Sequence, residues 1–424
     1  MRRLIQSHGA EVIHLGHNRS VEDIARAALQ EDADGIALSS YQGGHNEFFA
    51  YLVDMLKERG AEHIRVFGGG GGTITPEEAT ALHDHGVERI YHPNDGAKFG
   101  LTGMIDNLIE RANEKQRPAL RPETVSPDNE FSVGQMLSAI EDGILGETEL
   151  GKLRKEWEIA GKLTPVIGFT GTGGAGKSSV VDELLLRFLQ AFTDIRIAVL
   201  AVDPTRRRSG GALLGDRIRM NAINHPNIYM RSIATRDSVG EIPEVVGDVA
   251  AACKLSGFDL VIIETPGIGQ GDAAIVPLVD VSLYVMTPEF GAQSQLEKID
   301  MLDFASMVAI NKFDRKGAED AYRDVSKQVQ RNREAWTQAI EEMPVFGTIA
   351  ARFNDDGVTA LYHEMLQQLA ALGLQIQDDK LPTSGLRKSS GNTVIIPAER
   401  TRYLAEIAET VRGYKQDVAG QAVI

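Results

Sequence analysis

Short apolar runs and amphipathic stretches alternate along the first third of the chain. The short runs predict β-strands, and the longer stretches carry apolar residues at helical spacing. The predicted strands cover residues 11–15, 35–39, 64–67 and 89–92, and the predicted helices cover 20–33, 45–59, 76–85 and 98–113. Ser20 is placed to cap the helix at 20–33, with Asp23 at its third position. This alternation predicts a doubly wound α/β domain with a parallel sheet.

The chain opens on a different pattern. Residues 2–9 resemble the last turns of a helix, whereas a doubly wound domain of the flavodoxin-like order 2-1-3-4-5 begins with a strand. In that order the first strand lies between the second and the third. We therefore expect a sheet that lacks its first strand. Because a central parallel strand is buried on both faces, we expect this lack to destabilise the domain.

A second series of strands and helices follows a linker. Pro118, Pro122 and Pro127 interrupt any helix in the linker, and an amphipathic helix is predicted at 131–145. Apolar strands are then predicted at 165–170, 195–201, 258–263 and 307–310. We divide the chain into a first domain at 1–115, a linker and helix at 116–144, a second doubly wound domain at 145–370 and a connecting segment at 371–424.

Composition narrows the possible functions. The 424 residues include 44 Lys and Arg against 60 Asp and Glu, a formal net charge of −16. Nucleic-acid binding needs clustered cations, so we expect no nucleic-acid partner. Cys253 is the only cysteine, which excludes an intrachain disulfide and a cysteine metal cage. The sequence has no apolar run of 18 residues and no signal-peptide pattern, so we expect a cytoplasmic protein without a membrane partner.

The strand at 165–170 leads into a glycine-rich loop. Residues 171–178 read Gly-Thr-Gly-Gly-Ala-Gly-Lys-Ser and precede an apolar-periodic helix, which is the context that a phosphate-binding P-loop requires. Glycines let backbone N–H groups face phosphate oxygens, Lys177 reaches the β and γ phosphates in a catalytic role, and Ser178 places its hydroxyl on Mg²⁺. The predicted contacts are Gly173, Gly174, Ala175, Gly176, Lys177, Ser178 and Ser179.

Acidic residues after later strands are candidate Mg²⁺ ligands. Asp203 ends the strand at 195–201, and Glu264 and Thr265 end the strand at 258–263. Asp216 lies in the glycine-punctuated segment between these strands. Together with Ser178, these four residues form the predicted metal set. Asp203 could alternatively belong to a simple strand-ending turn.

For two further side chains, the sequence leaves two possible roles open. Arg219 is a candidate phosphate contact, although it and Asp216 could instead be surface charges. Gln270 follows the glycine turn of residues 264–269 and is a candidate for orienting the attacking water, but a plain loop amide accounts for it equally well.

The strand at 307–310 ends in a base-recognition pattern. Asn311, Lys312 and Asp314 form the motif N-K-x-D. The Asp314 carboxylate can accept hydrogen bonds from guanine N1–H and the exocyclic amine, whereas adenine offers no such donor pair, and an unpaired buried acceptor costs about 1–3 kcal/mol. Residues 348–350 follow the next strand, where a final guanine-contacting loop is expected.

These motifs resemble the G-protein chaperones of methylmalonyl-CoA mutase and, more closely, the G domain within fused isobutyryl-CoA mutases. The resemblance implies that GTP, Mg²⁺ and an acyl-CoA mutase barrel, as a domain or a separate chain, are partners, and that the assembly is a homodimer. Residues 295–298 resemble the third switch, which senses the mutase in that family. Residues 399–414 resemble the helix that connects to the barrel, and the barrel itself is not in this sequence.

The first domain resembles the cobalamin-binding domain of acyl-CoA mutases. The resemblance rests on residues 39–45 and on the glycines at 68–72, and it implies cofactor contacts at Ser39, Gly68 and Gly69. In that family an Asp-x-His-x-x-Gly motif supplies the lower axial ligand. Neither His14 nor His17 lies in such a motif, so we expect adenosylcobalamin to bind weakly or not at all.

We interpret the chain as a Mg²⁺-dependent GTPase of the type that loads and protects adenosylcobalamin in a radical mutase, an isomerase. The alternative is a cobalamin-binding subunit or fragment of the mutase in which GTP acts only as a switch. A third interpretation, an ATPase for amino-acid import, is disfavoured by the guanine-recognition motif at residues 311–314. Mutase activity from this chain alone is not expected without the barrel.

The role of Asp314 in base selection can be tested directly. In Asp314→Asn the acceptor becomes an amide that can donate to the O2 of xanthine, so we expect the variant to prefer xanthosine nucleotides. The measurement is the dissociation constant for GDP and for xanthosine diphosphate in both proteins. Equal binding of ATP and GTP by the native protein would contradict guanine selection.

Overall fold

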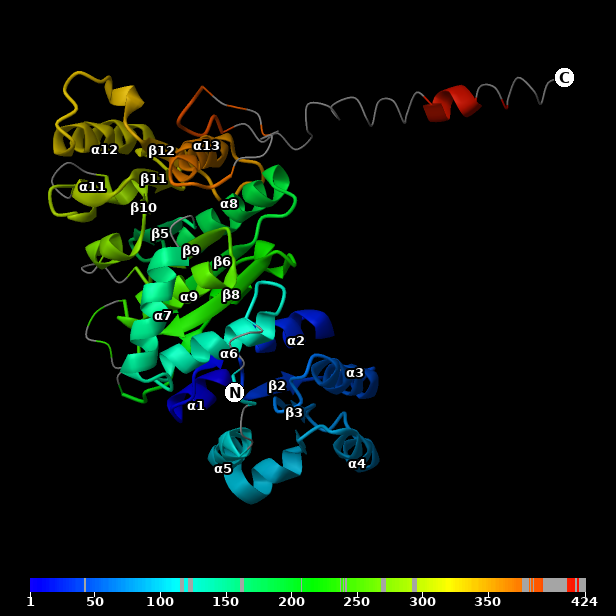
Figure 1. Ribbon diagram of the computed structural model, residues 1–424. Helices are drawn as coiled ribbons and strands as arrows, with labels where there is room; N and C mark the ends of the chain where they lie inside the picture. The colour runs from blue at the N-terminus through cyan, green and yellow to red at the C-terminus, as the bar shows by residue number, and fades with distance from the viewer. Residues whose placement is uncertain are drawn as a thin grey trace.

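The computed structural model describes most of the chain in detail. The described residues are 1–41, 43–114, 118–120, 125–160, 164–206, 208–236, 238, 240, 242–267, 272–291, 296–375, 381, 383, 385–391, 410–415 and 418. Two α/β units share the chain (Figure 1), the smaller in the first third and the larger around a seven-stranded sheet. The predicted fold class, two α/β units with parallel sheets in series, is confirmed.

The N-terminal unit contains a three-stranded parallel sheet of order β2-β3-β4. Its elements are α1 (Arg2–Ser7), β1 (Val12–Ile13), α2 (Val21–Gln30), β2 (Gly35–Ser39), α3 (His45–Glu58), β3 (Arg65–Gly69), α4 (Pro76–His85), β4 (Arg89–Tyr91) and α5 (Pro93–Asn113), which is kinked at Gly100. The predicted cap of α2 is confirmed, because the Ser20 hydroxyl accepts from Asp23 N at 3.0 Å and Ser20 N donates back to the Asp23 carboxylate. Apolar side chains of α2, α3 and α4 form the core with the sheet.

Strand β1 does not join that sheet. It was predicted as a strand of the first domain, but it pairs in parallel with β7 (Leu213–Leu214) of the larger unit. Val12 N donates to Ala212 O at 2.8 Å, and His14 N donates to Leu214 O at 2.9 Å. A Cβ on Gly211 would lie 2.1 Å from Gln6 O, so glycine permits the close approach of α1. The first residues therefore pack on the second unit, and β2-β3-β4 stands as its own sheet.

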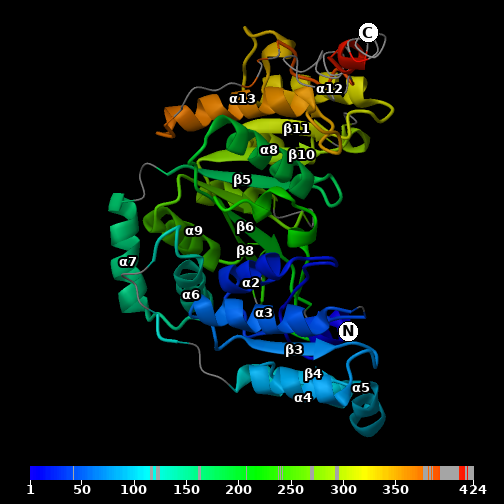
Figure 2. The same cartoon turned by 90° about the vertical axis from the view of Figure 1, so that its right-hand side faces the viewer.

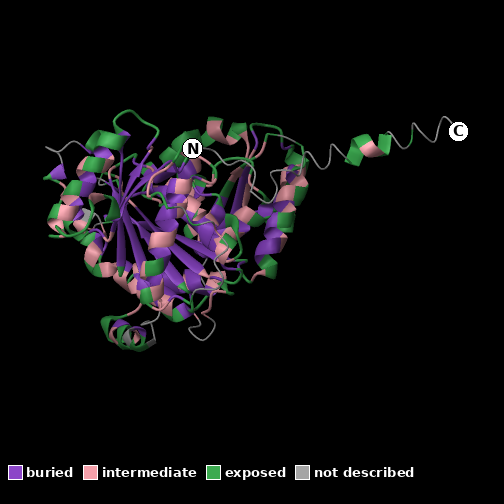
Figure 3. Cartoon of the chain, turned by 90° about the horizontal axis from the view of Figure 1, so that it is seen from above, coloured by how far each residue is buried: buried purple, intermediate pink, exposed green. Residues whose placement is uncertain are grey.

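The larger unit is a parallel sheet of order β12-β11-β10-β5-β9-β6-β8. Its strands are β5 (Val166–Gly171), β6 (Ile197–Asp203), β8 (Ile228–Ala234), β9 (Leu260–Glu264), β10 (Val281–Met286), β11 (Met307–Asn311) and β12 (Val345–Thr348). The strands are buried almost throughout (Figure 3), as expected for parallel strands covered on both faces. Their carboxyl ends share one edge, where ligands of doubly wound folds bind.

Helices cover both faces of this sheet. The core on one face includes α8 (Lys177–Ala191) and α13 (Asp356–Ala371). The core on the other face includes α6 (Glu130–Glu141), α7 (Glu147–Ala160), α9 (Val245–Ser256), α11 (Met301–Phe304) and α12 (Ala318–Asn332). The predicted linker helix therefore exists as α6, and the charged stretch after it is the separate helix α7.

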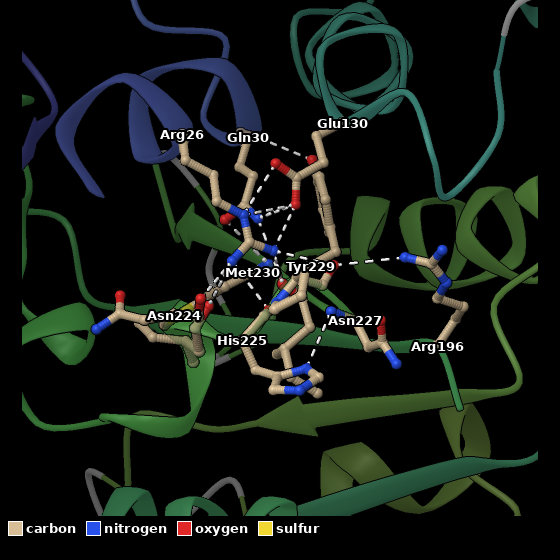
Figure 4. A network of polar contacts seen from close by, with 12 residues as sticks. Arg26, Gln30, Glu130, Arg196, Asn224, His225, Asn227, Tyr229 and Met230 are labelled. Atoms are coloured by element: carbon tan, nitrogen blue, oxygen red, sulfur yellow. Dashed lines mark hydrogen bonds and ion pairs between the residues drawn. The ribbon is translucent and has the colours of Figure 1, made fainter. Parts of the chain in front are cut away.

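Helix α2 joins the two units by packing on β8, the edge strand of the large sheet, and Figure 2 shows α2 between α3 and β8. Side chains of α2 and its C-cap bond to the β8 backbone. The Arg26 guanidinium donates to Ile228 O at 2.7 Å, and the carboxylate of Glu31 accepts from Ser232 N at 3.0 Å. An edge strand exposes unpaired peptide groups, and here polar side chains cover them (Figure 4).

A buried ion pair lies at the centre of this interface. Arg217 Nε donates to Glu31 Oε1 at 2.6 Å, with the two side chains 6% and 2% exposed. The Arg217 guanidinium also donates to Met230 O and to the Gln30 side chain. A buried pair of this kind adds little over an apolar pair, but the loss of one partner leaves the other charge buried and unpaired.

We predict that Glu31→Ala lowers the free energy of unfolding by about 3–5 kcal/mol, because Arg217 and Ser232 N lose their acceptor. Glu22→Ala on the same helix is the matched control, since its pair with Arg59 is solvent-exposed and should contribute less than about 1 kcal/mol. Urea unfolding measures both variants. A change for Glu31→Ala as small as that for Glu22→Ala would contradict the role of the pair.

Candidate functional site

The glycine-rich loop connects the end of β5 to the start of α8. Gly174 and Gly176 adopt positive φ angles of 75° and 93°, which glycine takes without strain. A Cβ on Gly171 would lie 1.9 Å from Val285 O of β10, so glycine is also required for packing. The loop therefore turns its backbone over the N-terminus of a 15-residue helix, an arrangement suited to phosphate.

Lys177 begins α8 and is buried. Its Nζ donates to Gly171 O at 3.0 Å and to Thr172 O at 3.4 Å, so the ammonium lies over the loop. Gly267, with a φ of 71°, passes close by, and a Cβ there would lie 2.1 Å from the Lys177 ammonium. Gly267, which follows β9, thus lies against the same lysine that the P-loop carries.

Three carboxylates converge beside the start of α8. The Ser178 hydroxyl donates to Glu264 Oε1 at 2.7 Å. Asp203 at the end of β6 accepts from Gly215 N at 3.2 Å and is hydrogen-bonded to Asp216, which begins the 3₁₀ turn η3 (Asp216–Ile218). The sequence-predicted residues Ser178, Asp203, Asp216 and Glu264 therefore lie together.

The electrostatics of these acids favour a bound cation. Burial, followed by the neighbouring Asp216 charge, raises the pKa of Glu264 to about 8, and burial with the Asp203 charge raises the pKa of Asp216 to about 6. Burial likewise raises the pKa of Asp203. Among the described residues, Glu264 Oε2 is a buried oxygen without a hydrogen-bond partner. A cation at this point would satisfy that oxygen and relieve the repulsion.

The described residues hold no preassembled group of three or more His, Cys, Asp or Glu ligands. Mg²⁺ in phosphate sites commonly takes one or two carboxylates and completes its shell with water and phosphate oxygens. The residues present therefore fit Mg²⁺ bound together with a nucleotide, with Ser178 and one or two of the acids as protein ligands.

The remaining predicted site residues differ in how they lie relative to the acid cluster. Arg219 bonds to Asp216 at 3.1 Å and is 65% exposed, which places it at the border of the acid cluster. The Thr265 hydroxyl donates to Thr170 Oγ1 at 3.1 Å and so points to β5. Ser179 is half-buried in the first turn of α8. Gln270 and residues 292–295 lie outside the described residues, so the position of Gln270 and part of the third-switch resemblance are not placed.

Asn311 connects the phosphate loop to the base-binding side. Its amide donates to Ala175 O at 2.8 Å, and its Oδ1 accepts from Thr348 Oγ1 at 3.2 Å and Ala350 N at 3.1 Å. Lys312 Nζ donates to Gly174 O at 2.7 Å. Hydrogen bonds of Asn311 and Lys312 thus connect the N-K-x-D motif to the P-loop and to residues 348–350. Asp314 is exposed and lines a cavity of about 410 Å³ with Ile349 and Arg352.

The loops predicted to hold cobalamin lie at the carboxyl ends of β2 and β3. Ser39 ends β2, and Ser40 N donates to Gly69 O at 2.9 Å. A Cβ on Gly68 would lie 2.4 Å from Ile90 and 2.6 Å from Phe49, whereas a Cβ on Gly69 meets only ordinary contact. Core packing therefore requires glycine at 68. This packing accounts for glycine at position 68 without a bound cofactor.

The fold and this arrangement of loops define a P-loop nucleotide-binding protein of the G-protein class. The chain belongs to the methylmalonyl Co-A mutase-associated GTPase MeaB family, whose model matches residues 148–380. A B12 binding domain model matches residues 2–93. In the described part of the chain, no helix combines the length and the apolar character needed to cross a membrane.

Individual relatives match the whole chain or a part of it. The fused isobutyryl-CoA mutase of Cupriavidus metallidurans is 58% identical over 100% of this chain, and that of Geobacillus kaustophilus is 50% identical over 100%. A putative GTPase of Pyrococcus abyssi is 31% identical over 58% of the chain and 71% of its own length. The chain spans only 39% and 40% of the two mutases. The predicted resemblance to fused isobutyryl-CoA mutases is confirmed.

We predict that Glu264→Gln flattens the pH dependence of stability in the metal-free, nucleotide-free protein. The pKa of Glu264 is raised from 4.5 to about 8, so the native state holds a proton that the unfolded state releases above pH 4.5. The free energy of unfolding therefore falls as pH rises towards 8, at about 1.4 kcal/mol per pH unit.

Urea unfolding in EDTA from pH 6.5 to 8 measures this slope, in a range above the pKa of about 6 of Asp216. Glu264→Gln carries no titrating proton and should be the more stable protein at pH 8. Equal slopes for the two proteins would contradict a protonated Glu264.

Proposed function

We propose that the chain is a Mg²⁺-dependent GTPase that serves as the G-protein chaperone module of an adenosylcobalamin-dependent acyl-CoA mutase of the isobutyryl-CoA or methylmalonyl-CoA type. The single observation that carries the nucleotide assignment is the Asn311 side chain, which joins the phosphate loop at Ala175 to the guanine loop at Ala350. The family match to a mutase-associated GTPase supports the chaperone role.

The chain's own residues account for the steps of hydrolysis. The Lys177 ammonium leaves Gly171 O and pairs with the β and γ phosphates, where it offsets the charge that develops on the leaving group. Ser178 and Glu264 would hold Mg²⁺, which neutralises charge on the same oxygens when bound. Gly267 lies beside Lys177, and in this proposal its backbone N–H contacts the γ phosphate. Asp314 selects the base.

The cobalamin part of the proposal rests on the B12 binding match at residues 2–93. Ser39, Gly68 and Gly69 lie at the carboxyl edge of the three-stranded sheet, where such folds bind ligands. The specific corrinoid, the acyl-CoA and the homodimer are parts of the proposal.

One observation favours the alternative in which GTP acts mainly as a switch. Asp216 lies in the acid cluster, and the next residue, Arg217, forms the buried ion pair with Glu31 of the N-terminal unit. A nucleotide whose binding moves η3 would therefore also change the contact between Arg217 and Glu31, the C-cap of α2. Two measurements separate the two functions: the affinity for adenosylcobalamin, titrated through its visible spectrum, and the rate of GTP turnover. Turnover with weak cobalamin binding favours the GTPase. Tight cobalamin binding with negligible turnover favours the switch.

We expect slow GTP hydrolysis that stops on addition of EDTA, with a rate of order 10⁻⁴ to 10⁻² per second in the absence of an activating arginine. Lys177→Ala should abolish turnover, because the Lys177 ammonium lies over Gly171 O, whereas the other lysine at the loop, Lys312, is bonded to Gly174 O on the base-binding side. Lys327→Ala, at an exposed position of α12, is the matched control and should keep full activity. Phosphate release measures all three proteins, and normal turnover by Lys177→Ala would refute the site.

A further inference from the structure

A short segment after α13 returns to the edge of the large sheet beside the base-binding loops. We name residues 385–391 the strap. Gly347 N of β12 donates to Arg387 O at 3.0 Å, and Ser389 N donates to Gly347 O at 2.8 Å, which makes a parallel bridge between Gly347 and Lys388. Because β12 is the terminal strand of the sheet, the strap supplies hydrogen-bond partners for the outward-facing peptide groups of Gly347.

The strap is anchored by side chains on both sides of this bridge. The Arg387 guanidinium lies 5.3 Å from the centre of the Phe346 ring and donates to Met343 O at 3.1 Å. Lys388 Nζ pairs with Glu319 of α12 at 2.7 Å. These contacts hold the strap across the ends of β12 and α12, so the position of Ser389 is fixed from its N-terminal side.

One buried carboxylate connects the strap to the base-binding loop. Asp355, the N-cap of α13, is 4% exposed. Its Oδ2 accepts from Ile349 N at 3.1 Å and from Val358 N at 2.9 Å, while its Oδ1 accepts from the Ser389 hydroxyl at 2.6 Å. The same side chain therefore holds the loop at 349–350, the start of α13 and the strap. A hydrogen bond to an ionised acceptor is about twice as strong as a neutral one.

The strap also forms a wall of the cavity in which Asp314 lies. Ser389 and Gly391 line this cavity of about 410 Å³ together with Asp314 and Arg352. The Arg352 guanidinium donates to Gly391 O at 2.8 Å, so the strap and the loop after β12 close this side of the cavity together. Part of the cavity wall is thus built from residues outside the P-loop, the N-K-x-D motif and the loop at 348–350.

We propose that Ser389 is a positioning residue for guanine recognition: through Asp355 it fixes the loop at 349–350, and the strap thereby contributes to the selection of guanine over other bases. This inference rests on the proposed binding of GTP. The strap bonds to Gly347 and Asp355, and the 349–350 loop reaches the P-loop through Asn311. Loss of the Ser389 hydroxyl should therefore weaken contacts to the base more than contacts to the phosphates.

The test compares Ser389→Ala with Ser389→Thr, which keeps the hydroxyl, in the full chain. Dissociation constants are measured for GDP, for inosine diphosphate, which lacks the exocyclic amine, and for ADP. We expect Ser389→Ala to bind GDP about tenfold more weakly, with little change for ADP, and to bind GDP and inosine diphosphate more nearly alike. Ser389→Thr should restore the native preference.

The outcomes separate this inference from the proposed function. If the native protein prefers GDP over ADP and Ser389→Ala keeps that preference, the positioning role is refuted and guanine binding stands. An equal loss of affinity for all three nucleotides refutes it as well, because a general loss of structure would then explain the effect. If the native protein does not distinguish GDP from ADP, the proposed function fails and the inference with it. Asp355→Asn is a second variant, which should reduce base preference in the same direction.

Discussion

A parallel sheet with buried edges must find partners for the peptide groups that its terminal strands leave open, and this constraint organises the whole chain. At β8 every residue is buried, yet no further strand pairs with it among the described residues. Side chains of α2 supply the missing partners, with Arg26 on Ile228 O and Glu31 on Ser232 N. Since one unpaired buried group costs about 1–3 kcal/mol, the N-terminal unit and the large unit stabilise each other through this edge.

The opposite edge of the sheet, at β12, also has partners for its open peptide groups, but here they come from backbone and not from side chains. There the strap pairs with β12 through its backbone, and Asp355 completes the connection. The two closing segments come from opposite ends of the sequence, one before the P-loop domain and one after it. Both lie beside parts of the nucleotide site, because the bridge at Gly347 lies next to Thr348 and Ile349, and α2 meets η3. The sheet therefore links nucleotide-binding loops to the flanking segments through its edges.

The sequence predicts the local chemistry well and the long-range contacts poorly. The P-loop, the acids after β6 and β9 and the N-K-x-D motif could be placed at the carboxyl ends of strands because strand, glycine loop and helix are read from neighbouring residues.

The pairing of β1 with β7 could not be predicted, because it joins residues about 200 positions apart through two short strands with no distinguishing pattern. The roles of Arg217 and Ser389 were missed for a similar reason. A single arginine or serine outside a motif carries no local signal of its partner. Asp355 offered one signal, since an acid directly before the apolar-periodic helix at 356–371 is a typical N-cap, but that position indicates a helix start and not a contact to a distant strap.

The acid cluster explains why the two units should respond to nucleotide together. Asp203, Asp216 and Glu264 are buried near one another, and their raised pKa values express the cost of ionising them without a cation. If Mg²⁺ binds with the nucleotide as proposed, it would remove that cost by satisfying Glu264 Oε2 and the Asp216 carboxylate. Asp216 and Arg217 belong to one three-residue turn, so a movement of the turn backbone would carry both side chains. Because Arg217 is buried in its ion pair with Glu31, and close-packed interiors tolerate little displacement, such a movement would either strain the α2 interface or move α2 with it.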